Sequence, residues 1–126
     1  MKKNLLLVFS GICLFTLMQS CTKEVHQSEN IKEITIDTTI RAGTDFDLSL
    51  APYGDDDNIA DIIQQAHHYS VSQIEELSDV FNPVYHYVAD VKSSGPDQVV
   101  IAISKDPDCK RPNKDSTIIT INFIIK

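Results

Sequence analysis

Glycine and cysteine are scarce in this chain of 126 residues, and tryptophan is absent. The chain contains no glycine-rich loop that could cradle a phosphate, no hydrolase nucleophile elbow and no paired zinc-ligand motif. Basic residues are also in the minority, with 11 Lys and Arg against 18 Asp and Glu. Because an acidic chain is repelled by phosphate, nucleic acid and anionic lipid headgroups are excluded as partners.

The chain also lacks an apolar run long enough to cross a membrane. Its longest run, residues 5–18, is interrupted only by Ser10, Gly11 and Thr16 and follows Lys2 and Lys3. As a helix it would span about 21 Å, which is less than the ~30 Å hydrocarbon core of a bilayer. A short apolar run after two lysines predicts a cleaved signal peptide.

The four residues that follow this run, Met18-Gln19-Ser20-Cys21, resemble the lipobox of bacterial lipoproteins of the Bacteroidota type. The resemblance implies cleavage after residue 20 and attachment of lipid to Cys21. Met18 and Gln19 depart from the strict pattern, whereas Ser20 fits it. The alternative is an ordinary secretory signal cut near Ser20, which would leave Cys21 as a free thiol. Either signal takes the protein out of the cytoplasm.

Cysteine use agrees with this interpretation. Cys13 lies within the signal peptide and Cys21 carries the lipid, so Cys109 alone remains. A single thiol cannot form an internal disulfide, which excludes a small fold stapled by cysteines.

The mature chain is predicted to have a short tether and one domain. Removal of residues 1–20 takes away two basic and no acidic residues, which leaves a net charge of −9. Residues 21–30 are polar and lack periodicity, as expected for a flexible tether. Residues 31–126 suffice for one domain with its own core.

Apolar residues in this domain recur mostly at every second position, which predicts β-strands. Turn residues such as Gly43, Gly54 and Gly95 separate the runs. We therefore predict an all-β protein, an antiparallel sandwich of about seven strands. The clearest predicted strands cover residues 34–40, 46–50, 68–75, 84–91, 98–104 and 117–125.

One segment suggests a helix instead. Ile59, Ile62, Ile63 and Ala66 have helical spacing, and the acidic residues 55–57 precede them, as at a helix N-terminus. A short helix near residues 58–67 is the prediction for this segment.

Three segments, FNPVYHY (81–87), GPDQVVI (95–101) and STIITINF (116–123), resemble the closing strands of bacterial immunoglobulin-like and cadherin-like domains. The segment YGDDD (53–57) resembles the Gly-Asp-rich stretch near the middle of such domains. The resemblance implies an Ig-like sandwich used for display, adhesion or assembly.

The acidic run Asp55, Asp56 and Asp57 is the strongest candidate for a metal site. Loop carboxylates can supply the oxygen ligands that calcium requires, and Asp61 or the loop pair 106 and 108 could join them. The spacing does not match the twelve-residue EF-hand loop, and a solvated loop is the alternative. The expected cofactor is therefore none, with calcium as the one candidate.

Other candidate groups have simpler interpretations. His67 and His68 are adjacent and cannot easily share one metal ion. Cys109 stands beside Lys110 and Arg111, which favour a thiolate, yet no base or orienting group accompanies it. The acidic pair at residues 75 and 76 could serve a glycosidase only if the fold set a suitable separation.

We expect a non-enzymatic module of the cell envelope, anchored by lipid, most simply to the outer membrane. Its partner would be an envelope protein or a glycan, bound through end loops near Tyr53 or through an edge strand at 117–125, where Asn122 lies. The alternatives are a calcium-dependent cadherin-like domain and a small envelope hydrolase. The hydrolase would require a buried carboxylate with a shifted pKa.

Overall fold

The computed structural model describes residues 30–105 and 115–126. Seven strands account for most of this part: β1 (Lys32–Ile40), β2 (Asp45–Ser49), β3 (Ile59–Gln64), β4 (Tyr69–Glu76), β5 (Pro83–Ala89), β6 (Gly95–Ser104) and β7 (Thr117–Ile125). A short 3-10 turn, η1 (Ala51–Tyr53), lies between β2 and β3. The predicted all-β class is confirmed, and each of the strands predicted most clearly is present.

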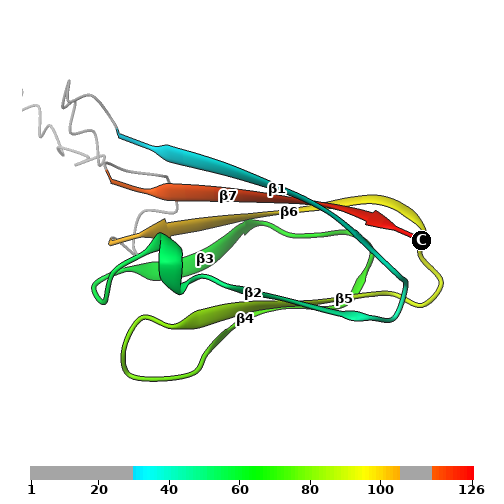
Figure 1. Ribbon diagram of the computed structural model, residues 1–126, viewed down its shortest axis with the longest axis horizontal. Helices are drawn as coiled ribbons and strands as arrows, with labels where there is room; N and C mark the ends of the chain where they lie inside the picture. Colours follow the sequence, from blue (N-terminus) through cyan, green and yellow to red (C-terminus); the bar gives the residue numbers. More distant parts are fainter. Residues whose placement is uncertain (1–29, 106–114) are drawn as a thin grey trace, which may run out of the picture.

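The strands form two stacked sheets (Figure 1). The four-stranded sheet has the order β1-β7-β6-β3, and the three-stranded sheet has the order β2-β5-β4. The orders β2-β5-β4 and β3-β6-β7 match the B-E-D and C-F-G strands of an immunoglobulin domain. The domain is therefore the Ig-like sandwich that the sequence predicts.

One strand pair departs from the expected antiparallel arrangement. β1 runs parallel to β7 over nine register pairs, from Lys32 opposite Thr117 to Ile40 opposite Ile125. The connection 41–44 carries the chain from one sheet to the other, so β1 cannot form a hairpin with β2. It takes the open edge of β7 instead.

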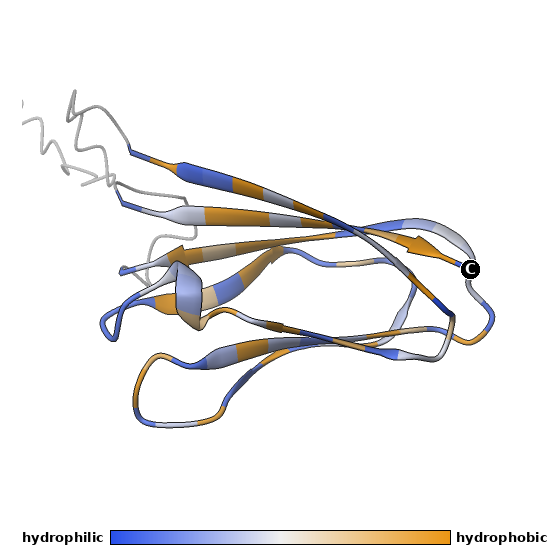
Figure 2. Ribbon diagram, in the orientation of Figure 1, coloured by the Kyte–Doolittle hydropathy of each residue, from blue (hydrophilic) through white to orange (hydrophobic). Residues whose placement is uncertain are grey.

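The core lies between the two sheets and follows the two-residue period of the strands (Figure 2). Its centre is aromatic: the ring of Phe123 stacks on Tyr87 with centroids 4.1 Å apart and meets Phe46 edge-on at 5.2 Å. These contacts join β7 of one sheet to β5 and β2 of the other. Tyr85 and Tyr87 are fully buried, as expected for tyrosines on one face of a strand.

The predicted helix near residues 58–67 is wrong, because this segment contains β3. Ala60 and Ile62 face the core, whereas Ile59 and Ile63 are exposed. Antiparallel pairing with β6 outweighs the helical spacing, in line with the β-branched isoleucines of the segment. In the described residues, no helix is long and apolar enough to span a membrane.

The connections β2–β3 and β4–β5 pack against each other at the end of the sandwich where β1 begins (Figure 1). Gly54 lies close to Phe81 of the β4–β5 connection and to Ile103 of β6. A Cβ atom added there would lie 2.5 Å from Cε1 of Phe81 and 2.9 Å from Cγ2 of Ile103. The backbone of Gly54 is extended, so the requirement for glycine is steric.

We predict that Gly54→Ala destabilises the domain by about 1–3 kcal/mol, because the added methyl group overpacks the contact with Phe81 and Ile103. Urea unfolding followed by circular dichroism measures the change. The matched control is the double variant Gly54→Ala/Phe81→Ala, in which the methyl group gains space. A loss in the double variant equal to the sum of the two single losses would show that the contact does not limit packing.

Candidate functional site: the outer face of the four-stranded sheet

Several predictions concern residues that lie outside the described part of the chain: the signal peptide 1–20, all but the last residue of the tether 21–30, Cys21, Cys109 and the acidic loop pair 106 and 108. Residues 30 and 31 precede β1, and β1 begins at the end of the sandwich that carries the β2–β3 and β4–β5 connections (Figure 1). A tether that ended there would leave the sheet faces and their edges at the side of the molecule.

The acidic residues Asp55, Asp56 and Asp57 form the β2–β3 turn. The N–H of Asn58 donates to the carbonyl of Asp55 at 2.9 Å, and the N–H of Asp55 donates to Oδ1 of Asn58 at 2.6 Å. The turn is thus closed by Asn58. Within residues 30–105 and 115–126, no group of three His, Cys, Asp or Glu side chains is placed to hold a metal ion. This geometry lends no support to a calcium site.

Tyr53, the candidate binding residue of the end loops, was expected to be exposed, and the structure corrects that expectation. Its side chain is half-buried and packs against the core from η1. Its remaining surface lines a shallow depression with Asn58 and Lys105. Tyr53 thus contributes to packing at this end, and its role in binding stays a prediction.

The histidines do not converge on one point. His67 and His68 lie in the β3–β4 connection, whereas His86 lies in β5 on the three-stranded sheet. Nδ1 of His86 contacts Oδ1 of its cross-strand partner Asp47, and this hydrogen bond raises the pKa of His86. The pair is a surface contact on the outer face of that sheet.

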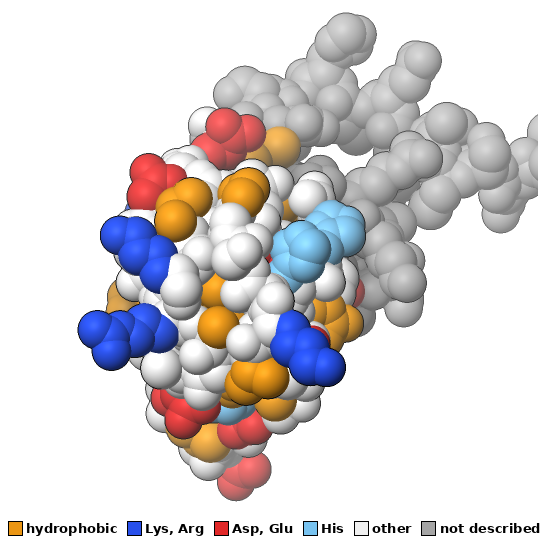
Figure 3. Space-filling view, turned by 90° about the vertical axis from the view of Figure 1, so that its right-hand side faces the viewer, with side chains coloured by type: hydrophobic (Ala, Val, Ile, Leu, Met, Phe, Trp, Pro, Cys, Tyr) orange, Lys and Arg blue, Asp and Glu red, His pale blue; other side chains and the backbone are white. Residues whose placement is uncertain are grey.

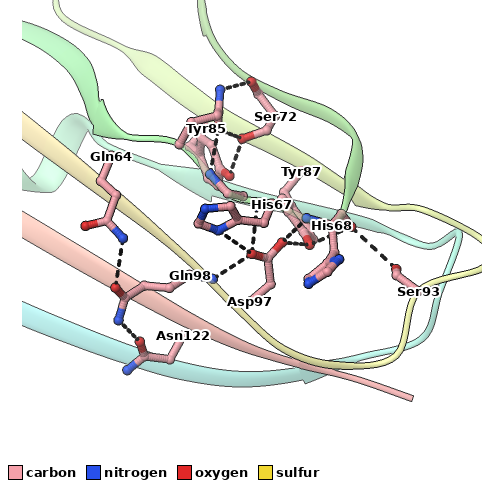
Figure 4. Close-up of polar contacts among 12 residues, drawn as sticks. Gln64, His67, His68, Ser72, Tyr85, Tyr87, Ser93, Asp97, Gln98 and Asn122 are labelled. Atoms are coloured by element: carbon pink, nitrogen blue, oxygen red, sulfur yellow. Dashed lines mark hydrogen bonds and ion pairs between the residues drawn. The ribbon is translucent and has the colours of Figure 1, made fainter.

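A buried carboxylate is present, in Asp97 at the start of β6 (Figure 4). Its side chain is 1% exposed and accepts four hydrogen bonds. The backbone N–H groups of His67 and His68 donate at 2.8 and 2.9 Å. The Tyr87 hydroxyl donates at 2.8 Å, and the N–H of Gln98 donates at 2.9 Å. Asp97 thus ties the β3–β4 connection to β5 and β6.

This environment does not suit Asp97 for acid–base catalysis. Burial by itself would raise the pKa of Asp97, but the four hydrogen bonds stabilise the carboxylate more strongly and lower it. Burial and the bond to Asp97 raise the pKa of Tyr87. Asp97 is therefore ionised at neutral pH, and its oxygens already hold the fold together. It does not match the proton-carrying carboxyl group of the hydrolase hypothesis.

Asn122 lies in the middle of the four-stranded sheet. The expectation that residues 117–125 form an edge strand is wrong, because β7 pairs with β1 on one side and with β6 on the other. The edges of this sheet are β1 and β3. The long apolar pattern of β7 reflects this central position.

The side chain of Asn122 belongs to a row of hydrogen bonds that crosses all four strands; Figure 4 shows three of its members. Nε2 of Gln64 in β3 donates to Gln98 in β6 at 3.2 Å. Nε2 of Gln98 donates to Asn122 at 2.7 Å, and Nδ2 of Asn122 donates to Asp37 of β1 at 2.8 Å. A shallow hollow lined by Gln64, Gln98 and Asn122 lies over this row.

The outer face of β6 and β7 carries no charged side chain. Its outward positions, given by the burial pattern and the register, are Pro96, Gln98, Val100, Ala102, Ser104, Ile118, Thr120, Asn122 and Ile124. Edge strand β3 adds Ile59 and Ile63. Three of the seven exposed large apolar residues in the described chain thus belong to this sheet: Ile59, Ile63 and Ile124, which are 40%, 41% and 46% exposed.

Other surfaces of the domain differ from this face. The outer face of the three-stranded sheet carries Asp45, Asp47, Glu75 and His86. The end that carries the β1–β2, β3–β4 and β5–β6 connections mixes basic, acidic and apolar side chains (Figure 3). An uncharged sheet face is thus confined to β6 and β7.

One sequence signal for this face was present. Residues 99–103 of β6 form an unbroken apolar run, which is typical of a strand covered on both sides, whereas a strand with one face in water alternates. The polar members of the row gave no comparable signal, because Gln64, Gln98 and Asn122 are distant in sequence. Their register brings them together.

Comparisons with known proteins leave the family open: no family model matches the chain, and no curated protein matches it. Among solved structures, the cysteine protease inhibitor EhICP2 from Entamoeba histolytica is 13% identical, with 76% of this chain and 95% of that chain covered and a TM-score of 0.46. PbICP-C in complex with falcipain-2 is 11% identical, with coverages of 79% and 93% and a TM-score of 0.49.

An endo-fucoidan hydrolase from glycoside hydrolase family 107 is 12% identical, with a TM-score of 0.44. The matched region spans 76% of this chain and only 13% of that enzyme. Similarities at this level do not assign a function to the chain.

We predict that Asp97→Asn lowers the free energy of unfolding by about 2–3 kcal/mol at pH 7, because an amide cannot accept all four hydrogen bonds. The pKa of Asp97 is lowered by folding, so the wild-type advantage is complete above the unfolded-state pKa, near 3.8, and is lost as the pH falls through the folded-state value. Urea unfolding of both proteins at pH 7 and at pH 2–3 tests this. A difference between the two proteins that did not shrink in acid would contradict the assignment.

Proposed function

We propose that this protein is a non-catalytic binding module of the bacterial cell envelope, anchored by lipid at Cys21, that binds a protein partner through the outer face of β6 and β7. The observation that carries the proposal is the uncharged character of this face.

A sheet face exposed to water is normally rich in charged and polar side chains. Charged residues make up 23% of the chain, yet none occupies the outward positions of β6 and β7. The centres of protein interfaces are depleted of charge in the same way, while their rims are polar. Here the rim is acidic, with Glu33 and Asp37 on β1 and Asp61 on β3.

The chemistry of the face favours a protein over other partners. The outward positions of the four strands include no aromatic side chain on which a sugar ring could stack. The acidic rim disfavours nucleic acid and anionic lipid. A protein surface with an uncharged centre and Lys or Arg at its margin fits both parts of the face. Each side-chain NH2 group of the row has a second N–H, which can donate to that partner.

The lipid anchor rests on the signal-like N-terminus and on the position of β1. The tether 21–30 would join the sandwich at one end, and ten extended residues reach about 33–36 Å. An anchor at this end leaves the outer face of β6 and β7 at the side of the domain, where a partner can approach it. The acidic turn Asp55–Asp57 lies at the anchored end and would be repelled from anionic headgroups.

We predict that Cys21→Ser releases the protein from the membrane fraction, because the acyl chains are its only attachment. Fractionation of bacterial cells that express the full chain, with intact-mass analysis of the purified protein, measures this. The control is Cys109→Ser, which should remain in the membrane fraction. Unchanged fractionation of Cys21→Ser would contradict lipid anchoring at this residue.

We predict that a photoreactive amino acid at position 124 cross-links to a discrete envelope protein, and that Thr120→Lys in the same chain abolishes the adduct. Thr120 faces outward between Thr35 and Val100, so the lysine places an unpaired charge at the interface centre. The substitution should cost about 1 kcal/mol of stability or less.

The matched control carries the photoreactive group at position 73, on the outer face of the three-stranded sheet. Adducts of equal yield from positions 124 and 73 would count against the proposal. So would an adduct from position 124 that Thr120→Lys leaves unchanged. Thermal unfolding of each variant confirms that the fold is retained.

A further inference from the structure

The open edge of β1 offers a second element of the same binding surface. Within the described residues, β1 is an end strand of the four-stranded sheet, and only β7 pairs with it. An end strand presents backbone donors and acceptors along its outer side. What this edge can bind depends on its regularity, its backbone directions and its side chains.

The backbone directions of β1 follow from its bonds to β7. The N–H of Lys32 donates to the carbonyl of Ser116 at 3.0 Å, and the carbonyl of Ile40 accepts from the N–H of Lys126 at 2.9 Å. The register between the two ends is continuous, so the even-numbered residues of β1 point their N–H and C=O groups at β7. The odd-numbered residues point theirs at the open edge: Glu33, Thr35, Asp37 and Thr39.

β1 lacks the features that protect the other edges. β2 has five residues, whereas β3 and β4 contain register shifts at residues 62–64 and 69–71. Short length, bulges and proline are ways in which proteins keep edge strands from pairing. β1 has nine residues in unbroken register, with no proline and with its single lysine at its first position. This edge is regular enough to template another strand.

The core beneath this edge is incompletely covered. Ile34, Ile36 and Ile40 of β1 are half-buried, as are Phe46 and Leu48 of the neighbouring β2. All five pack against the buried core from the side where β1 and β2 end the two sheets. Apolar side chains on an added strand would lie over these residues and remove more of their surface from water.

The outward side chains of β1 specify the charge of the occupant. Glu33 and Asp37 stand four residues apart on the outer face, and no Lys or Arg occupies an outward position of β1. An added strand places its own outward side chains directly opposite them, where opposite charges stabilise pairing and like charges oppose it. A second copy of β1 would bring two more carboxylates to the edge, so charge disfavours it.

We infer that β1 accepts an extended protein segment as an additional strand, and that this segment carries basic residues four positions apart on its outward side and apolar residues on its inward side. The inference rests on the proposed binding function and adds the backbone conformation and charge of the partner. The added strand would lie beside the uncharged face of β6 and β7 and extend the same sheet.

The test uses an end-blocked synthetic peptide, Thr-Val-Lys-Val-Thr-Val-Lys-Val-Thr, and the chain from residue 21 with Cys21→Ser. NMR titration should give shift changes along β1, and hydrogen exchange should show new protection of the odd-numbered amides of residues 33–39. The matched peptide with glutamate in place of lysine should bind about tenfold more weakly, because it opposes Glu33 and Asp37 with like charge. Equal binding of the two peptides, or no binding of the lysine peptide at millimolar concentration, would overturn the inference.

Two substitutions at one position separate the edge from the rest of the fold. Thr35→Pro removes an N–H that points outward, so pairing with β7 persists, and proline is tolerated at such edge positions. The proline variant should bind the lysine peptide about tenfold more weakly or worse, because the ladder of backbone hydrogen bonds to the peptide is interrupted. Thr35→Ala keeps the N–H and should bind like the wild type. Equal affinities of the proline and alanine variants would overturn strand addition.

Charge reversal provides a test that does not alter the backbone. Glu33→Lys should lower the affinity for the lysine peptide and raise the affinity for the glutamate peptide, each by about threefold or more. Sedimentation velocity of the protein without peptide tests whether a second copy of the chain binds to the β1 edge. A dimer that the Thr35→Pro substitution dissociates would show that the added strand comes from a second copy and would overturn the basic segment. The cross-link from position 124 is an independent readout. If the cross-link forms but the peptides do not bind, strand addition is rejected and the proposed function stands. If the cross-link does not form, the proposed function itself is rejected.

Discussion

The packing of the two sheets against each other depends on the contact between Phe123 and Tyr87. The rings stack with centroids 4.1 Å apart, and Phe46 closes the group from a third strand. The hydroxyl of Tyr87 then reaches Asp97, whose carboxylate also holds the backbone of His67 and His68. A single tyrosine thus joins the apolar core to the polar clamp that sets the β3–β4 connection. Because the carboxylate oxygens of Asp97 accept four hydrogen bonds, the group can remain buried and ionised.

This core leaves the two sheets with different outer surfaces. The three-stranded sheet carries charged side chains on its outer face, such as Asp47, which contacts His86. The four-stranded sheet has an uncharged centre on β6 and β7, a row of amides across its strands and acidic side chains at both edges. Its edge strand β1 is long and unbroken. Face and edge therefore belong to one sheet, and the binding surface proposed above includes both.

The local sequence pattern predicted where the strands lie better than it predicted which strands are neighbours in the sheets. The two-residue alternation of β1, β2 and β7 is a property of the sequence, and all three strands form where it predicts them. The segment 59–64 misled because its isoleucines also fit a helical period, and only the pairing with β6 decided between the two. The prediction that Asn122 lies in an edge strand was wrong for a related reason. The side-chain pattern of a strand does not show whether the backbone on either side of that strand is paired. Tyr53 was placed correctly in a turn, but its packing against the core is a tertiary contact.

The sequence by itself determined the acidic charge and the all-β class, because these follow from composition and from the period of the apolar residues. The export signal stays a prediction. Only the tertiary structure decided which strands lie in the centre and which at the edges. Strand order depends on contacts between residues far apart in the chain, such as Asp37 and Asn122, which no local pattern encodes. The binding surface proposed here is defined by that order, and so it emerges only when the two sheets are assembled.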